Sequence, residues 1–195
     1  MAKSGFLLLE DGAVFRGVPF GAERSAVGEV VFNTSMTGYQ EVLTDPSYAG
    51  QIVVPTYPMM GNYGVNDQDY ESAKIQVAGF VVRQWCPTPS HGLSEHTLHD
   101  YLASQGVPGL AEVDTRALTR RLRTRGVMMG VLAVGISVGE ARELLRQAPS
   151  YGTVNFVEAV SCPSLYKWPG LLEGDLGETS SSQKEFPPAW RVVVL

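Results

Sequence analysis

Cysteine is scarce in this sequence, and long apolar runs are missing from it. Cys86 and Cys162 are the only cysteines among 195 residues, so a disulfide framework is excluded and both thiols are expected to be reduced. No window approaches the roughly 18 consecutive apolar residues of a membrane span, and residues 1–9 lack the cleavage site of a signal peptide. The sequence therefore predicts a cytoplasmic protein that does not associate with membranes.

Basic residues are also few. The 15 lysines and arginines are outnumbered by 20 aspartates and glutamates, which leaves a formal net charge of -5. A general nucleic-acid binder needs a basic surface that displaces counterions from phosphate groups, so that class of function is excluded. The hydrophobic fraction of 44% and the charged fraction of 18% are typical of a globular protein.

The 21 glycines and 12 prolines divide the chain into short segments. Apolar runs at 6–9 and 13–15 flank Asp11-Gly12 and predict a hairpin. Further β-branched or alternating runs predict strands at 29–32, 51–56, 75–82, 110–113 and 127–134.

Capping patterns predict four helices. One is capped by Ser94 and stopped by Gly106, a second is capped by Asp114 or Thr115 and stopped by Gly126, and a third has Ser137 and Glu140 at capping-box spacing and stops at Pro149. A short fourth helix is expected at 39–43, entered through Thr37 with Gln40 at the same spacing.

Together these elements predict an α/β fold with a mixed sheet over residues 1–150. Residues 151–189 are irregular, acidic and serine-rich towards their end, which predicts a linker. The apolar run at 190–195 is expected to begin the first strand of a second domain.

The segment 28–48 is dense in hydroxyl groups and small residues. Such a segment after a strand can present N–H groups and hydroxyls to a polar ligand, but the same residues also serve as caps and turn formers. Asp45 and Pro46 are expected to form an Asx turn that holds Ser47 in one place.

Histidine and cysteine offer two weaker alternatives. His96 and His99 are three residues apart and could contribute to a zinc site, although no fourth well-spaced ligand follows. Cys86 with His91 could form a nucleophile and base pair, giving a self-sufficient thiol hydrolase, although no nucleophile elbow surrounds the cysteine.

Five arginines fall within ten positions, at 116, 120, 121, 123 and 125. On one helix they are expected to point several ways and to form a charged collar. Such a collar is either a solvated helix surface or a docking surface for an acidic partner, and the second interpretation allows an autonomous module that only docks a partner.

Three segments carry a resemblance to a known family. They are LLLEDGAVFRG at 7–17, GAERSAVGEVVFNTSMTGYQEVLTDPSYAGQIVVPTYPMMGNYGVN at 21–66, and EVDTRALTRRLRTRG at 112–126. Over residues 5 to about 135 the chain resembles the N-terminal half of the small subunit of glutamine-dependent carbamoyl phosphate synthetase.

The resemblance implies a swivelling β/β/α domain followed by the start of a class I amidotransferase domain, in a cytoplasmic ligase that serves arginine and pyrimidine biosynthesis. In that family the small subunit hydrolyses glutamine, and the large subunit, the implied partner, uses ammonia, ATP, magnesium and bicarbonate. The amidotransferase triad has no matching positions here, so the chain is expected to bind no cofactor itself and to be inactive alone. The serine of Asp-Pro-Ser-Tyr, here Ser47, is implied to contact glutamine.

Overall fold

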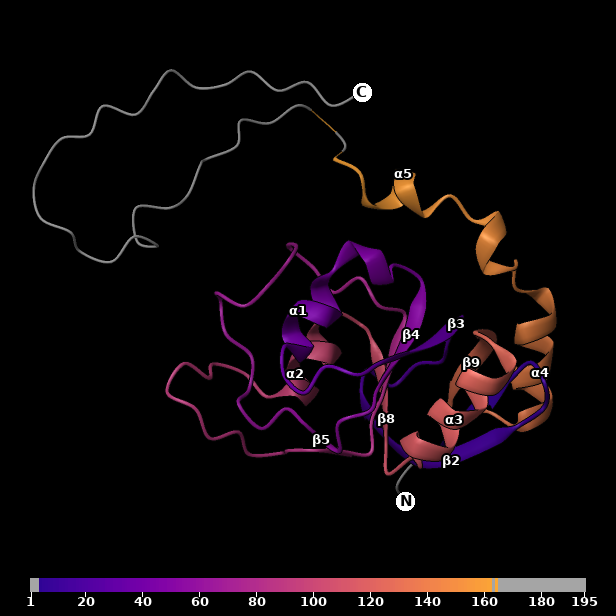
Figure 1. Cartoon of the computed structure of the whole chain (residues 1–195), viewed down its shortest axis with the longest axis horizontal. Helices are drawn as coiled ribbons and strands as arrows, with labels where there is room; N and C mark the ends of the chain where they lie inside the picture. Colours follow the sequence, from indigo (N-terminus) through magenta and orange to yellow (C-terminus); the bar gives the residue numbers. More distant parts are fainter. Residues whose placement is uncertain (1–3, 163, 165–195) are drawn as a thin grey trace, which may run out of the picture. The chain divides into compact units, whose positions relative to one another are not determined.

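The computed structural model describes residues 4–162 and 164 (Figure 1). Residues Met1–Ser161 make up one of the two compact units of the chain, and the elements below belong to it. The predicted strand at 190–195 and most of the predicted linker lie outside the described residues, so the predicted division of the chain at 150 and 189 stays a prediction.

Seven strands close into a barrel in the order β1-β2-β8-β6-β4-β3-β9. They are β1 (Gly5–Leu9), β2 (Val14–Gly21), β3 (Ala26–Asn33), β4 (Gln51–Pro55), β6 (Gly79–Val81), β8 (Pro108–Ala111) and β9 (Met128–Val134). The pairs β3–β4, β4–β6 and β6–β8 are parallel and the others are antiparallel. The predicted mixed sheet and N-terminal hairpin are therefore confirmed, whereas closure into a barrel was not predicted. A separate parallel pair joins β5 (Met59–Met60) to β7 (Gln84–Trp85).

Alternation along the strands separates the barrel interior from the layers outside it. On β1, Leu7 and Leu9 belong to the interior cluster, whereas Phe6 and Leu8 belong to a second cluster that includes Ala141. All five residues of β1 are buried, because the barrel covers one face of this strand and a helix covers the other. This explains why the run 6–9 reads as continuously apolar instead of alternating.

Five helices accompany the barrel in the described residues: α1 (Tyr39–Thr44), α2 (Leu98–Ser104), α3 (Thr115–Arg125), α4 (Val138–Gln147) and α5 (Phe156–Val160). Two short 3-10 turns, Pro46–Tyr48 and Tyr151–Thr153, complete the list. Helix α2 packs on β2 and β8, and α4 packs on β9 and β1. Leu118 and Leu122 of α3 join the interior cluster, so this helix packs against the interior of the barrel. None of the helices in the described part of the chain is long and apolar enough to cross a bilayer.

Two of the predicted helix caps are confirmed. The carboxylate of Asp114 accepts a hydrogen bond from the Ala117 N–H at 2.9 Å at the start of α3. Ser137 and Glu140 form the predicted capping box at the start of α4. Each satisfies N–H groups that the first turn of a helix leaves without a partner.

The two other predicted caps are wrong. Thr97, not Ser94, caps α2 by accepting from the Asp100 N–H at 3.1 Å. Gly38, not Thr37, occupies the cap position of α1 at φ 80°, and no side chain caps this helix locally. Instead, the hydroxyl of Tyr63 accepts hydrogen bonds from the N–H groups of Gly38 and Tyr39. A partner 24 residues away leaves no trace in local sequence spacing.

The predicted strand at 75–82 is also too long, since the ladder covers Gly79–Val81 alone. Ile75 and Val77 are buried as expected. The Ile75 N–H, however, donates to the side chain of Gln105 and the Gln76 N–H donates to the Leu43 carbonyl. The alternating apolar pattern correctly predicted which side chains are buried, but a side chain can be buried without its backbone pairing in a strand. In the predicted linker, α5 and the turn Tyr151–Thr153 replace an irregular segment.

Closure of the barrel predicts a strict requirement for glycine on β2. A Cβ at Gly17 would lie 2.3 Å from the Ala111 carbonyl oxygen, so Gly17→Ala should lower the free energy of unfolding by about 1–3 kcal/mol through overpacking. Gly139 is the control, because its Cβ would meet nothing closer than 3.8 Å and Gly139→Ala should be neutral or stabilising by up to about 1 kcal/mol. Chemical denaturation of the two variants measures the difference, and equal stabilities would contradict the close approach of β2 to β8.

Candidate functional site

The hydroxyl-rich segment forms the connection between the parallel strands β3 and β4, and it contains α1 and the 3-10 turn Pro46–Tyr48. A parallel pair requires a crossover, so this segment must leave the barrel and return to it. Its polar groups fall into two sets. One set holds the crossover in place, and the other remains available on the surface.

The first set is a buried network. Gln40 is fully paired with the backbone of Asn66, donating to its carbonyl at 2.5 Å and accepting from its N–H at 3.0 Å. The hydroxyl of Thr44 donates to the Gln40 carbonyl and accepts from the Glu71 N–H, each at 2.9 Å. Ser72 donates to the Thr44 carbonyl at 2.6 Å. These groups fasten the segment that follows β5 onto α1, so capping and turn chemistry accounts for them.

A pair of tyrosines also belongs to this buried network. The rings of Tyr39 and Tyr63 stack with centroids 4.2 Å apart, and the Tyr39 hydroxyl donates to the Gly64 carbonyl. Burial raises the pKa of both phenols above the ordinary value for tyrosine. Both therefore stay protonated at neutral pH, which suits hydrogen-bond donation and not a role as a general base.

Ser47 belongs to the second set. Its N–H donates to the Asp45 carboxylate at 2.8 Å, which confirms the predicted Asx turn. The serine is exposed, and within residues 4–162 its hydroxyl makes no recorded hydrogen bond. The backbone donor is thus occupied inside the turn while the side chain is free to meet a ligand.

Aromatic residues, some of them distant in sequence, hold the 3-10 turn that contains Ser47 in place. The Tyr48 hydroxyl accepts from the Asn33 amide at 2.9 Å, and the Tyr151 hydroxyl donates to the Ala49 carbonyl at 2.9 Å. Tyr151 stacks on Phe156 with ring centroids 4.7 Å apart. Phe156 lies so close to Gly50 that a Cβ there would be 2.3 Å from its ring. Sequence inspection missed Tyr151 and Phe156, because nothing in the irregular segment 151–169 links it to a turn about 100 residues earlier.

The histidines and cysteines are engaged separately. His99 Nδ1 accepts from the Gly21 N–H at 2.9 Å, and its ring stacks against Trp85 with centroids 5.6 Å apart. Cys86 Sγ donates to the Thr88 carbonyl at 3.2 Å, whereas His91 accepts from the Leu93 N–H at 3.3 Å. No three ligand-type side chains of the described segment gather to hold a metal ion. Neither the zinc site nor the Cys86–His91 pair gains a supporting contact.

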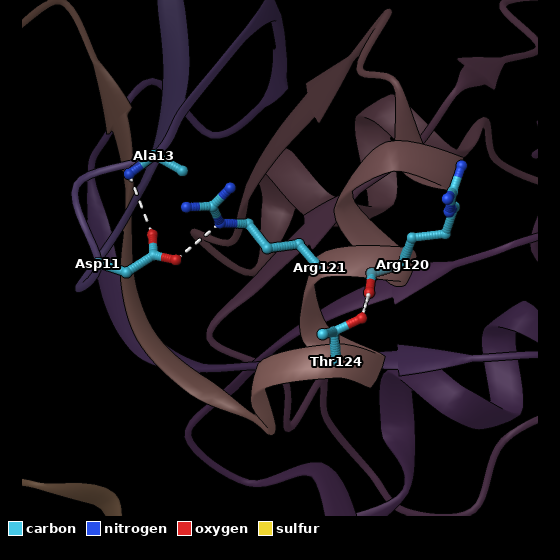
Figure 2. Close-up of polar contacts among 5 residues, drawn as sticks. All are labelled: Asp11, Ala13, Arg120, Arg121 and Thr124. Carbon is cyan, nitrogen blue, oxygen red and sulfur yellow. Dashed lines mark hydrogen bonds and ion pairs between the residues drawn. The ribbon is translucent and has the colours of Figure 1, made fainter.

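The arginines of α3 divide into two groups. Arg121 Nε lies 2.7 Å from Asp11 Oδ2 in the hairpin turn, and the other oxygen of Asp11 accepts from the Ala13 N–H at 3.1 Å (Figure 2). The hydrogen bond from Arg121 holds the pKa of Asp11 below its usual range, and the charge of Arg125 acts in the same direction. Arg120 points away from this pair in Figure 2.

The remaining arginines, Arg116, Arg120 and Arg123, are exposed. Their spacing of i, i+4 and i+7 places them along one side of the helix, opposite the buried Leu118 and Leu122. The five arginines therefore point several ways, as predicted: three align along one side, Arg121 faces Asp11, and the charge of Arg125 acts on the same carboxylate.

Comparison with known protein families identifies the family to which this chain belongs. The family model described as carbamoyl-phosphate synthase small chain, CPSase domain, matches residues 7–132. The chain belongs to this family. The matched stretch begins within β1 and ends within β9, and it contains the buried network of Gln40, the turn at Ser47 and helix α3.

Curated relatives agree with this assignment. The carbamoyl phosphate synthase small chain of Solidesulfovibrio magneticus is 51% identical over 169 residues, covering 84% of this chain and 44% of the relative. That of Vibrio cholerae is 47% identical over 189 residues, covering 94% of this chain and 50% of the relative. This chain thus spans about half the length of the curated relatives it matches. A solved aminopeptidase from Aneurinibacillus sp. strain AM-1 aligns with a TM-score of 0.38 at 15% identity over 67% of this chain and 30% of that chain, which is too weak to support an argument.

The ion pair between the hairpin and α3 predicts a pH-dependent contribution to stability. Because the pKa of Asp11 is lowered in the folded state, the pair stabilises the protein above the unfolded-state pKa of about 4 and is lost as the pH falls through the folded-state value. Asp11→Asn should therefore lower the melting temperature at pH 6 and have a smaller effect at pH 3. Differential scanning calorimetry at both values measures this. An effect that is the same at both values would show that the charge of Asp11 adds nothing to the fold.

Proposed function

We propose that this chain is the N-terminal half of the small subunit of a glutamine-dependent carbamoyl phosphate synthetase. In this role it docks on the large subunit and completes the glutamine site, and the whole complex acts as a cytoplasmic ligase. The observation that carries the proposal is the family match over residues 7–132. Alignment with about half of each relative supports the assignment to a half of the small chain.

The finer features of the proposed fold follow from the family. The barrel with its helices would be the swivelling domain, residues 151–189 would be the linker, and residues 190–195 would begin the class I amidotransferase domain. The described residues include the barrel and residues 151–162 of the proposed linker, whereas the swivelling role and the amidotransferase strand rest on the resemblance. Glutamine hydrolysis is assigned to the amidotransferase half, and ATP and magnesium are assigned to the large subunit.

The proposed role of Ser47 is to hold glutamine across the boundary between the two halves. Its N–H is already bonded to Asp45, so the contact falls to the free hydroxyl, which can donate one hydrogen bond and accept others. The turn is positioned by bonds at Tyr48 and Ala49. A donor held in place before the ligand arrives needs little ordering when glutamine binds.

The chemistry of the chain itself is expected to be limited to binding. Nucleophilic hydrolysis of an amide requires a thiol or hydroxyl, an adjacent base and an oxyanion site together. Cys86 and His91 are each engaged in local hydrogen bonds, and both tyrosines of the buried network are held protonated. In this proposal, the residues of this half position and bind glutamine, and the cleavage is left to the amidotransferase half.

Substitution of the serine tests the proposed glutamine contact. In the complete small subunit with its large partner, Ser47→Ala should reduce kcat/KM for glutamine by about two- to tenfold, as expected for one lost neutral hydrogen bond of roughly 0.5–1.5 kcal/mol. Carbamoyl phosphate synthesis from free ammonia should be unchanged, because ammonia enters after the glutaminase step. Steady-state assays with the two nitrogen donors provide the measurement.

Ser35→Ala is the matched control, since Ser35 is an exposed hydroxyl of the same crossover and should alter neither activity. If Ser47→Ala reduces the glutamine and ammonia reactions equally and also lowers the melting temperature, Ser47 is a turn former and its proposed role in binding is wrong.

The isolated chain should release no glutamate from glutamine above background, because its thiols lack a paired base in the described structure. Glutamate release from the purified 195-residue chain measures this directly. Turnover that disappears in Cys86→Ser would overturn the proposal and favour the thiol hydrolase, whereas turnover that survives this change would point to a contaminating enzyme and call for further purification.

A further inference from the structure

Helix α3 carries charge that its own stability does not explain. Arg116 is in the first turn, where the positive end of the helix dipole disfavours a cation. Arg116 and Arg120 are like charges at i, i+4, a spacing that destabilises a helix. Arg123 is placed favourably in the last turn, so the unfavourable placements are confined to the other two.

Among the described residues, no acidic partner is recorded for Arg116, Arg120 or Arg123. The ion pairs recorded among the described residues join Arg121 to Asp11 and Arg146 to Glu143. The side chains of Arg116, Arg120 and Arg123 make no recorded ion pair or hydrogen bond in this part of the chain. Within residues 4–162, these three guanidinium groups are thus unneutralised on one exposed face, in a chain whose net charge is -5.

The shape of this face argues against a small ligand. Three residues spread over seven positions span about 10 Å of helix at 1.5 Å per residue. The four hollows characterised on the described surface are lined by other residues. An exposed helix face that lines none of these four hollows suits a macromolecular surface, and guanidinium groups match carboxylates in geometry as well as in charge.

We propose that the stripe of Arg116, Arg120 and Arg123 on α3 is the surface through which this chain docks on an acidic, carboxylate-bearing patch of the large synthetase subunit. This inference rests on the proposed function, because it takes the partner from it. The opposite side of the same helix is fixed to the protein twice, by Leu118 and Leu122 in the interior cluster and by Arg121 on the hairpin (Figure 2). The stripe is therefore presented on a rigid element, which limits the ordering cost of binding.

The test compares the binding of three forms of the 195-residue chain to the purified large subunit of the same organism. The unmodified chain should bind with an affinity that falls as salt rises from 50 to 300 mM, as expected for charge-steered association. The variant Arg116→Gln, Arg120→Gln, Arg123→Gln should bind at least roughly tenfold more weakly and with a flatter salt dependence. Glutamine preserves helix propensity, and a melting temperature at or above that of the unmodified chain would confirm the fold.

The control variant, Arg16→Gln, Arg83→Gln, Arg142→Gln, removes three exposed arginines that lie outside α3 and should bind like the unmodified chain. Equal binding by the stripe variant and the unmodified chain would overturn the docking surface while leaving the proposed function standing. Equal weakening in both variants would overturn it too, since net charge alone would then explain the effect. Absence of binding by the unmodified chain would overturn both proposals, and equally tight binding to a single-stranded oligonucleotide would show a general anion surface instead.

Discussion

Closure of the sheet between β1 and β9 is the constraint on which the other features depend. Closing seven strands forces β2 and β8 together at Gly17, where no side chain fits. It also places three parallel pairs side by side, and each needs a crossover outside the barrel. The crossover from β3 to β4 carries Ser47, and the connection from β8 to β9 carries α3. The proposed glutamine contact and the proposed docking stripe thus lie on segments whose ends the barrel holds fixed.

The two proposed sites are supported in different ways. The turn at Ser47 is held by polar and aromatic contacts, with the hydrogen bond from the Ser47 N–H to the Asp45 carboxylate inside it and Tyr151 at its base. Helix α3 is held by apolar burial on one side and by one ion pair at the surface. The hydrogen bonds around the turn fix the position of one residue, Ser47, with its hydroxyl. The rigid helix α3, in contrast, displays several positive charges at a fixed spacing. Each kind of support suits the role proposed for it.

Much of the barrel could be predicted from the sequence, because apolar runs indicated the approximate position of each barrel strand. The capping residues Asp114 and Ser137 indicated where two helices begin. Apart from the cap of α2, which is Thr97 and not Ser94, the predictions that failed involved partners distant in sequence. Tyr63 replaces the expected cap at Thr37, and Gln105 takes the N–H of Ile75 that a strand would have paired. At the candidate site, Asp45 and Ser47 could be predicted because an Asx turn is local. The clamp by Tyr151 and Phe156, and the division of the arginines between Asp11 and solvent, depend on tertiary placement that local spacing does not encode.

The central claim is that residues 5–162 act as the N-terminal half of a carbamoyl phosphate synthase small chain. The most direct measurement replaces the matching segment of the Solidesulfovibrio magneticus small chain, 51% identical to this one, with residues 5–162 and assays the chimera with that organism's large subunit. The account predicts that carbamoyl phosphate is formed from glutamine at a rate within about tenfold of the parent complex. A folded chimera that restores no glutamine-dependent synthesis, while ammonia-dependent synthesis by the large subunit continues, would contradict it.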